Sequence, residues 1–191
     1  MQTMSETKMT MSERRIMNAG VMRAFLRDKL FALNPRTPNQ VAWVDVRGDK
    51  ADLYISNCNS GKELRRDFLS RIKPTMLQFS SQGSLLALGH DCGARIYGGS
   101  AKSALEGFLT GFNVNFARFS PDENRILFGN HQQGSILFAE VYEGNLCWEK
   151  RLPFEIHPLA PVHFQGDDLW LYGKDCQRVV VKAHTGEEIS S

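Results

Sequence analysis

The sequence predicts an all-β protein built from a repeated unit of short strands. The unit is a phenylalanine, a turn, an apolar strand, a glycine, a second turn and another apolar strand. It begins at Phe79, Phe119 and Phe164, at spacings of 40 and 45 residues. Short apolar runs bounded by Gly, Asp, Asn or Pro are typical of strands buried on both faces. Repeats of this length indicate a β-propeller array. We therefore predict a partial or small β-propeller of three to four blades, with one N-terminal amphipathic α-helix.

The composition is that of an ordinary globular protein of one domain with an appendage. The 191 residues are 42% apolar and 23% charged, and the net charge of +2 gives no field that favours nucleic acid or an anionic membrane. No apolar run approaches the ~20 residues of a membrane span. The first fifteen residues lack the apolar core of a secretory signal. The basic stretch to Leu33 leaves a mitochondrial transit peptide as an alternative, against which Glu6, Glu13 and Asp28 count. We expect a cytoplasmic protein.

The N-terminal segment before the repeats is predicted to be helical. Residues 1–11 are polar and aperiodic, which predicts a disordered lead-in. Ser12 is a plausible N-cap for an amphipathic helix over 12–34, and Pro35 and Pro38 end it in a linker over 35–40. The helix is expected to cap the propeller, to dock into a partner protein or, least of all, to lie on a membrane surface. The predicted partner-binding residues of its apolar stripe are Ile16, Met22, Phe25, Leu26, Leu30 and Leu33.

The repeats occupy 41–191, divided at about 41–73, 74–112, 113–158 and 159–191. In the first repeat, strands are predicted at 41–46 and 51–56, joined by a turn at 47–50. The stretch 61–74 does not alternate and looks more helical, so this repeat is expected to lose or distort its outer strands. Strands of the other repeats are predicted at 75–79, 84–89, 94–98, 104–109, 114–119, 125–129, 135–142, 146–152, 161–164, 169–173 and 178–183.

These repeats resemble the WD-repeat β-propeller family. Phe119-Ser120-Pro121-Asp122 matches the turn that ends the family's first strand, and Thr185-Gly186 resembles the turn before its last strand. The resemblance covers about 41–191 and is strongest over 75–152. The Trp-Asp dipeptide of the family is absent, with Tyr97-Gly98 in its place, and so is the Gly-His pair that opens a repeat. The hydrogen-bonded tetrad of many family members is therefore not expected.

The number of predicted blades favours association of this chain with another protein chain. At ~40 residues a blade the repeats give fewer than four blades, whereas closed propellers have four to eight. An open array exposes apolar faces and strand edges. Completion by the N-terminal segment, blades donated by a partner protein, and pairing of two copies all remain open. We expect a non-enzymatic interaction scaffold or accessory subunit of a multiprotein complex. The alternative is a self-contained module that binds a peptide or small ligand in its central channel.

The sequence offers little that resembles catalytic chemistry. Phosphate-loop, Gly-x-Ser-x-Gly and His-Glu-x-x-His motifs are absent. Gly89-His90-Asp91-Cys92 could suggest a Cys-His nucleophile, but adjacent turn residues rarely bring their side chains together. We therefore predict no catalytic, cofactor or metal site, and a polar turn surface as a second contact region. The residues of this predicted turn surface are His90, Asp91, Asn130, His131 and Gln132.

Two further expectations concern cysteine and tryptophan. Cys58, Cys92 and Cys176 are predicted to occupy one repeat position, a hairpin turn, as reduced thiols. Equivalent turns of neighbouring blades lie too far apart for a disulfide, which tolerates roughly 7 Å between Cα atoms. Trp170 is expected to face the interior of its blade.

Overall fold

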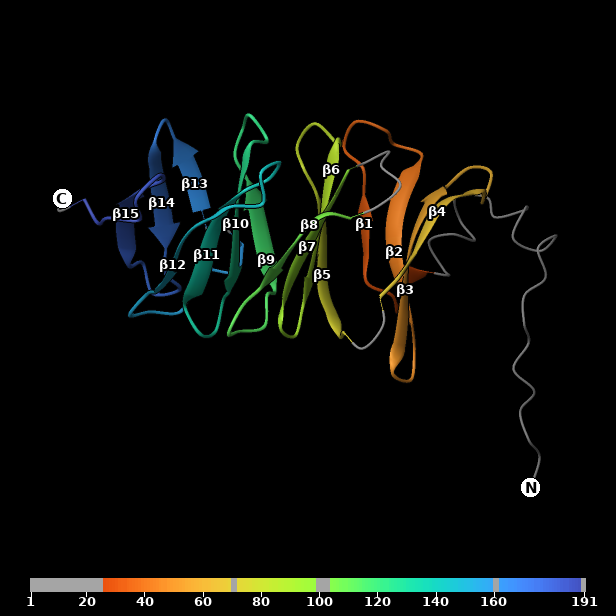
Figure 1. Cartoon of the computed structure of the whole chain (residues 1–191), viewed down its shortest axis with the longest axis horizontal. Helices are drawn as coiled ribbons and strands as arrows, with labels where there is room; N and C mark the ends of the chain where they lie inside the picture. Colours follow the sequence, from red (N-terminus) through yellow and green to blue (C-terminus); the bar gives the residue numbers. More distant parts are fainter. Residues whose placement is uncertain (1–25, 70–71, 99–103, 160–161, 190–191) are drawn as a thin grey trace, which may run out of the picture.

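The computed structural model describes residues 26–69, 72–98, 104–159 and 162–189. In this part of the chain fifteen strands form four antiparallel sheets that lie side by side (Figure 1). Among the described residues, no helix is long and apolar enough to cross a membrane. The all-β class is therefore confirmed.

Each sheet is a meander whose strands follow one another in chain order. The first sheet contains β1 (Phe31–Leu33), β2 (Gln40–Arg47), β3 (Lys50–Asn57) and β4 (Glu63–Phe68). The second contains β5 (Pro74–Phe79), β6 (Leu85–His90), β7 (Gly93–Gly98) and β8 (Ala104–Leu109). The third contains β9 (Phe116–Phe119), β10 (Arg125–Asn130), β11 (Ser135–Glu140) and β12 (Leu146–Arg151). The fourth contains β13 (Val162–Gln165), β14 (Asp168–Tyr172) and β15 (Arg178–Lys182), and the bridge between Val181 and Glu188 stands where a further strand would pair.

The core consists of apolar layers between consecutive sheets. In β6, Leu86 and Leu88 join the layer shared with the first sheet, whereas Leu85 and Ala87 join the layer shared with the third. A strand between two neighbours must be apolar on both faces, which explains its continuous apolar run. β10 divides its side chains in the same way, with Phe128 on one side and Leu127 on the other.

The first sheet begins earlier than the sequence predicted. Phe31–Leu33 form β1 and pair with β2, so the predicted helix over 12–34 is wrong at its C-terminal end. The expected linker over 35–40 is mostly the β1–β2 connection, in which Asn34 Oδ1 accepts hydrogen bonds from the backbone N–H groups of Arg36 and Thr37. Local side-chain bonds of this kind favour a turn over a helix. The rest of the predicted helix, and the lead-in, lie outside the described residues.

The stretch predicted to be helix-like after the first strand pair is also a strand. β4 pairs with β3 through an irregularity between Ile55 and Ser56. Leu64 and Phe68 are 51% and 55% exposed, so this outer strand does not need the alternation of a buried one. β4 therefore forms through backbone pairing with β3, although its side chains lack the alternation that would predict a strand.

The four sheets form an open row rather than a ring. The first and fourth sheets lie at opposite ends of the long axis of the molecule (Figure 1). The row thus has two end sheets, each with one face that no other described sheet covers.

Candidate interaction surfaces

The predicted polar turn surface is only partly accessible. His90 and Asp91 lie at the β6–β7 turn, and the other three residues lie at the β10–β11 turn. Asp91 and Gln132 are exposed and His131 is half-buried, but His90 and Asn130 are 3% and 5% exposed. The side chains of His90 and Asn130 are therefore buried within the domain and are not available to a partner protein. A partner-binding role for the accessible ones remains a prediction.

Asn130 and His131 hold their turn in place. Asn130 Nδ2 donates to the carbonyl of Asn113 at 2.7 Å, and its Oδ1 accepts from the backbone N–H of Gln133 at 2.9 Å. The His131 ring stacks on Phe116 with 4.4 Å between centroids. Burial lowers the pKa of His131 below its ordinary value, so the ring is held neutral.

His90, Asp91 and Cys92 bring three different donor atoms together at the β6–β7 turn. His90 Nδ1 lies 3.4 Å from Cys92 Sγ and 3.7 Å from Asp91 Oδ1, and one donor atom of each residue lies within 4.8 Å of the others. The expectation that these adjacent side chains diverge is therefore wrong. The turn folds His90 inward and leaves Asp91 and Cys92 exposed beside it.

This cluster does not have the electrostatics of an activated nucleophile. Burial, assisted by the charge of Arg95, lowers the pKa of His90. Burial and the neighbouring Asp91 raise the pKa of the Cys92 thiol. A catalytic cysteine needs a lowered pKa beside a protonated base, and both shifts run the opposite way.

The cysteines only partly follow the predicted repeat position. Cys92 and Cys176 lie in the turns between the second and third strands of their sheets, as predicted. Cys58 follows β3 instead, because the unrecognised β1 shifts the strand count of the first sheet by one. All four cysteines are unpaired thiols.

The predicted partner-binding stripe of the N-terminal segment divides into three parts. Ile16, Met22 and Phe25 lie outside the described residues. Leu26 is 4% exposed and packs with Val41, Trp43 and Tyr54 on the outer face of the first sheet. Leu30 packs against the layer between the first two sheets, and Leu33 is 59% exposed on β1. Leu26 and Leu30 are thus used inside the domain.

On its side away from the third sheet, the fourth sheet carries a mixed and partly exposed surface, which we call the end face. It consists of the side chains of β13–β15 that point away from the third sheet: His163, Gln165, Asp168, Trp170, Tyr172, Arg178, Val180 and Lys182. Val180 on this face is 8% exposed. Leu169 and Leu171 point the other way, into the apolar layer shared with the third sheet. The expectation that Trp170 faces inward is therefore wrong. The period-two alternation of β14 was the signal that could have located this surface.

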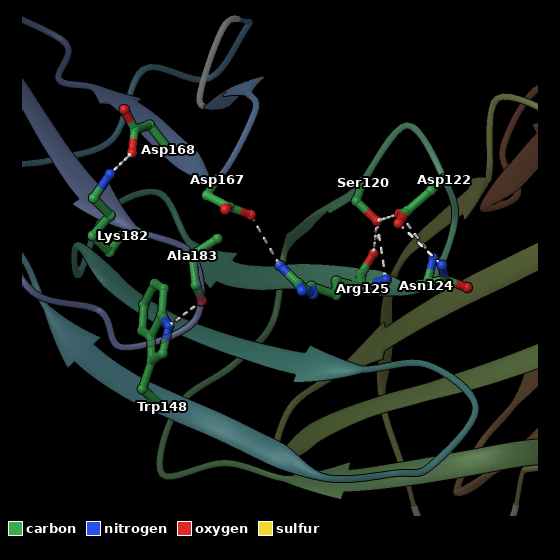
Figure 2. A network of polar contacts seen from close by, with 9 residues as sticks. All are labelled: Ser120, Asp122, Asn124, Arg125, Trp148, Asp167, Asp168, Lys182 and Ala183. Atoms are coloured by element: carbon green, nitrogen blue, oxygen red, sulfur yellow. Dashed lines mark hydrogen bonds and ion pairs between the residues drawn. The ribbon is translucent and has the colours of Figure 1, made fainter.

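Trp170 is the centre of the end face. It pairs with His163 on one side and Val180 on the other, and the Arg178 guanidinium lies 5.0 Å from the centroid of its ring. Its Nε1 is buried without a hydrogen-bond partner among the described residues. A buried indole N–H usually has a partner. At one end of the face, Lys182 Nζ donates to Asp168 Oδ1 at 2.7 Å (Figure 2).

The outer face of the first sheet is different because the chain itself occupies it. Trp43 stacks on Tyr54 at 4.2 Å, and Leu26 packs against both. Asp45 binds Lys29 and Arg47 at 2.6 and 2.5 Å. The two ends of the row therefore offer unequal surfaces to a partner.

Polar contacts anchor the fourth sheet to the third (Figure 2). Trp148 of β12 donates from Nε1 to the carbonyl of Ala183 at 2.7 Å. Within the Phe-Ser-Pro-Asp turn, Ser120 Oγ donates to Asp122 Oδ1 and accepts from the backbone N–H of Arg125. The Arg125 guanidinium then lies 3.9 Å from Asp167 of the fourth sheet. These contacts fix the position of the end face.

A groove of about 570 Å³ lies beside β11 and β12 of the third sheet. It is open and polar, and its lining residues are Gly111, Phe112, Gln133, Ser135, Glu149, Lys150 and Arg151. Binding sites for small ligands are mostly apolar and enclosed. The groove is therefore a weaker candidate than the end face.

Comparisons with known proteins support the fold alone. No family model matches the sequence, and no curated protein matches it. Among solved structures, the C-terminal WD40 domain of Sif2 is similar, with a TM-score of 0.63 and 14% sequence identity. The match covers 85% of this chain and 50% of that chain, so this chain spans half the length of the solved domain. The predicted WD-repeat-like β-propeller fold is thereby confirmed.

Proposed function

We propose that this chain is a non-enzymatic protein–protein interaction module that associates through the end face, with a second copy of itself as the partner. The observation that carries the proposal is the cluster of Trp170, Tyr172, Arg178 and His163 on the side of an end sheet that no other described sheet covers. Trp, Tyr and Arg are the residue types that dominate the binding energy of protein interfaces. A subunit role in a larger assembly follows from the same surface.

The end face can meet the end face of a second copy through its middle row. Its middle row is His163, Trp170 and Val180, with Asp168 in the row on one side and Arg178 in the row on the other. A two-fold axis along the middle row, perpendicular to the strands, sets the row of Tyr172 and Arg178 of one copy opposite the row of Asp168 and Lys182 of the other. Such an isologous contact uses the same patch twice. It also buries Trp170 against its symmetry mate.

The size of the end face determines how strongly two copies are expected to associate. Two strands of five residues and one of four cover roughly 16 by 14 Å. This area is at the small end for a protein interface, which favours concentration-dependent association over a permanent dimer.

The test is light scattering of the purified chain over a range of concentrations. We expect the mass to rise from 21.6 kDa toward twice that value. Trp170→Asp should hold the protein at the monomer mass, because it places an uncompensated charge in the middle of the contact. Leu109→Asp is the matched control, since Leu109 is 85% exposed on β8 of the second sheet. A monomer at every concentration, or association that survives Trp170→Asp, would contradict the proposal.

The alternative of a ligand site in a closed central channel has less support. The four described sheets form an open row, and the groove next to β12 is polar. The predicted contacts of Ile16, Met22 and Phe25 remain a separate prediction for the N-terminal segment.

A further inference from the structure

The β6–β7 turn carries a set of metal-ligand donors that the sequence analysis did not predict. The four cysteines form no Cys-x-x-Cys pair, which is the usual sequence signal of a zinc site. The structure instead combines one cysteine with the two residues that precede it. An imidazole nitrogen, a carboxylate oxygen and a thiol sulfur converge at His90, Asp91 and Cys92.

The distances fit a shared tetrahedral ion. Zinc lies about 2.0–2.1 Å from nitrogen, 2.0–2.2 Å from oxygen and 2.3 Å from sulfur, so neighbouring ligands are separated by roughly 3.3–3.8 Å. His90 Nδ1 lies 3.4 Å from Cys92 Sγ and 3.7 Å from Asp91 Oδ1. These two separations already match two edges of the tetrahedron. The third separation, between the donor atoms of Asp91 and Cys92, is within 4.8 Å, and both of these side chains are exposed and can move to complete the ligand set.

Backbone contacts hold the turn in this shape from both sides. Asp91 N–H donates to the carbonyl of Lys73 at 3.1 Å, and Thr110 N–H donates to the carbonyl of Cys92 at 3.1 Å. Gly93 closes the turn where a Cβ atom would lie 2.0 Å from the carbonyl oxygen of Phe108. The donors are therefore preorganised, which lowers the cost of binding.

We propose that His90, Asp91 and Cys92 bind a borderline-soft divalent cation of the zinc class. A thiolate and an imidazole select such ions over magnesium and calcium, which prefer oxygen ligands. Thiolate and carboxylate supply two negative charges against the cation, and Arg95 nearby offsets part of them. Asp91 and Cys92 are exposed, so the ion can enter from solvent and keep a fourth position for water or for a partner's side chain.

The fourth sheet contains a natural control for this site. Its β14–β15 turn is Lys174-Asp175-Cys176-Gln177, with the same Asp-Cys pair but a lysine where the β6–β7 turn has His90. Lysine is not a zinc ligand when protonated, and Cys176 lies at a φ of +63° in a differently shaped turn. The same dipeptide without the histidine is therefore not expected to bind the ion.

The test is a titration of the full, untagged, reduced chain with Co²⁺, followed by the thiolate-to-cobalt charge-transfer absorption. We expect saturation at one equivalent and displacement of the cobalt by Zn²⁺. Cys92→Ser should abolish the charge-transfer band. Asp91→Asn should lower the affinity for cobalt by at least about tenfold, because even the loss of a group that only supports a ligand lowers metal affinity 10–100-fold. Both side chains are exposed, so neither variant should disturb folding.

Cys176→Ser is the matched control and should bind cobalt as the unchanged protein does. Absence of the charge-transfer band, or a band that persists in Cys92→Ser, would overturn the proposal. A band lost in Cys176→Ser would overturn it as well, because another thiol would then hold the ion. None of these outcomes depends on self-association through the end face.

Discussion

At the scale of single residues, burial decides which polar side chains can act. His131 shows this clearly, since its ring stacks on Phe116 and its Nδ1 is buried without a hydrogen-bond partner among the described residues. Removing the ring from water disfavours its charged form. A residue that looks like a surface contact in the sequence is thus partly buried by a ring contact within the domain.

His131 should make the protein less stable in mild acid. Its folded pKa lies below the ordinary value of 6.5, so the unfolded state binds more protons once the pH falls below about 6.5. The free energy of unfolding therefore decreases as the pH falls from there toward the folded pKa, by at most about 1.4 kcal/mol per pH unit for one group. Urea denaturation at pH 7.5 and 5.5 should show a smaller decrease for His131→Gln than for the unchanged protein.

The exposed His184 supplies the control for this measurement. His184→Gln should retain the pH dependence of the unchanged protein. Loss of the ring contact with Phe116 will lower the stability of His131→Gln at both pH values, so the difference between the two pH values is the quantity to compare. Equal differences in all three proteins would show that His131 does not contribute.

At the scale of elements, contacts between sheets depend on close approach of backbone and ring. Gly186 has a φ of +71°, and a Cβ atom there would lie 2.8 Å from the ring of Trp148. The same ring donates its Nε1–H to Ala183. The turn after β15 therefore fits Trp148 only with glycine at this position.

Gly186→Ala should cost more than the same change at Gly166. Both glycines have positive φ, so each substitution carries the ~1 kcal/mol cost of the left-handed conformation. Nothing lies within 4 Å of a Cβ atom at Gly166, whereas Gly186→Ala adds an overpacking cost of about 1–3 kcal/mol. Free energies of unfolding from urea titrations should separate the two variants by that amount, and equal values would argue against tight packing on Trp148.

The elements that the sequence could predict are those buried on both faces. β6 and β10 stand out because each supplies apolar layers on two sides. β1 and β4 were missed because Leu33 and Phe68 are exposed, and their strand geometry depends on pairing with β2 and β3. The sequence also could not show that His90 turns toward Cys92, since that contact depends on tertiary geometry.

At the scale of the whole molecule, the stability of each sheet depends on the sheets that pack next to it in the row. In repeat arrays each unit gains its stability from its own sheet and from the adjoining interfaces. The second and third sheets have a sheet on both sides, whereas the fourth packs only on the third. The end face is therefore expected to lie on the least stable sheet.

Hydrogen exchange measured by mass spectrometry should resolve this order. Backbone amides in β6 and β10 should exchange most slowly, and those in β13–β15 faster, because sub-global opening starts where buried contacts are fewest. Raising the protein concentration should slow exchange in β14, since association through the end face gives the fourth sheet a second neighbour. Exchange in β6 should not change, and in Trp170→Asp the effect on β14 should disappear. Exchange in β14 as slow as in β6 at low concentration would mean that the fourth sheet is already covered on both faces, and the end face would then not be a free surface.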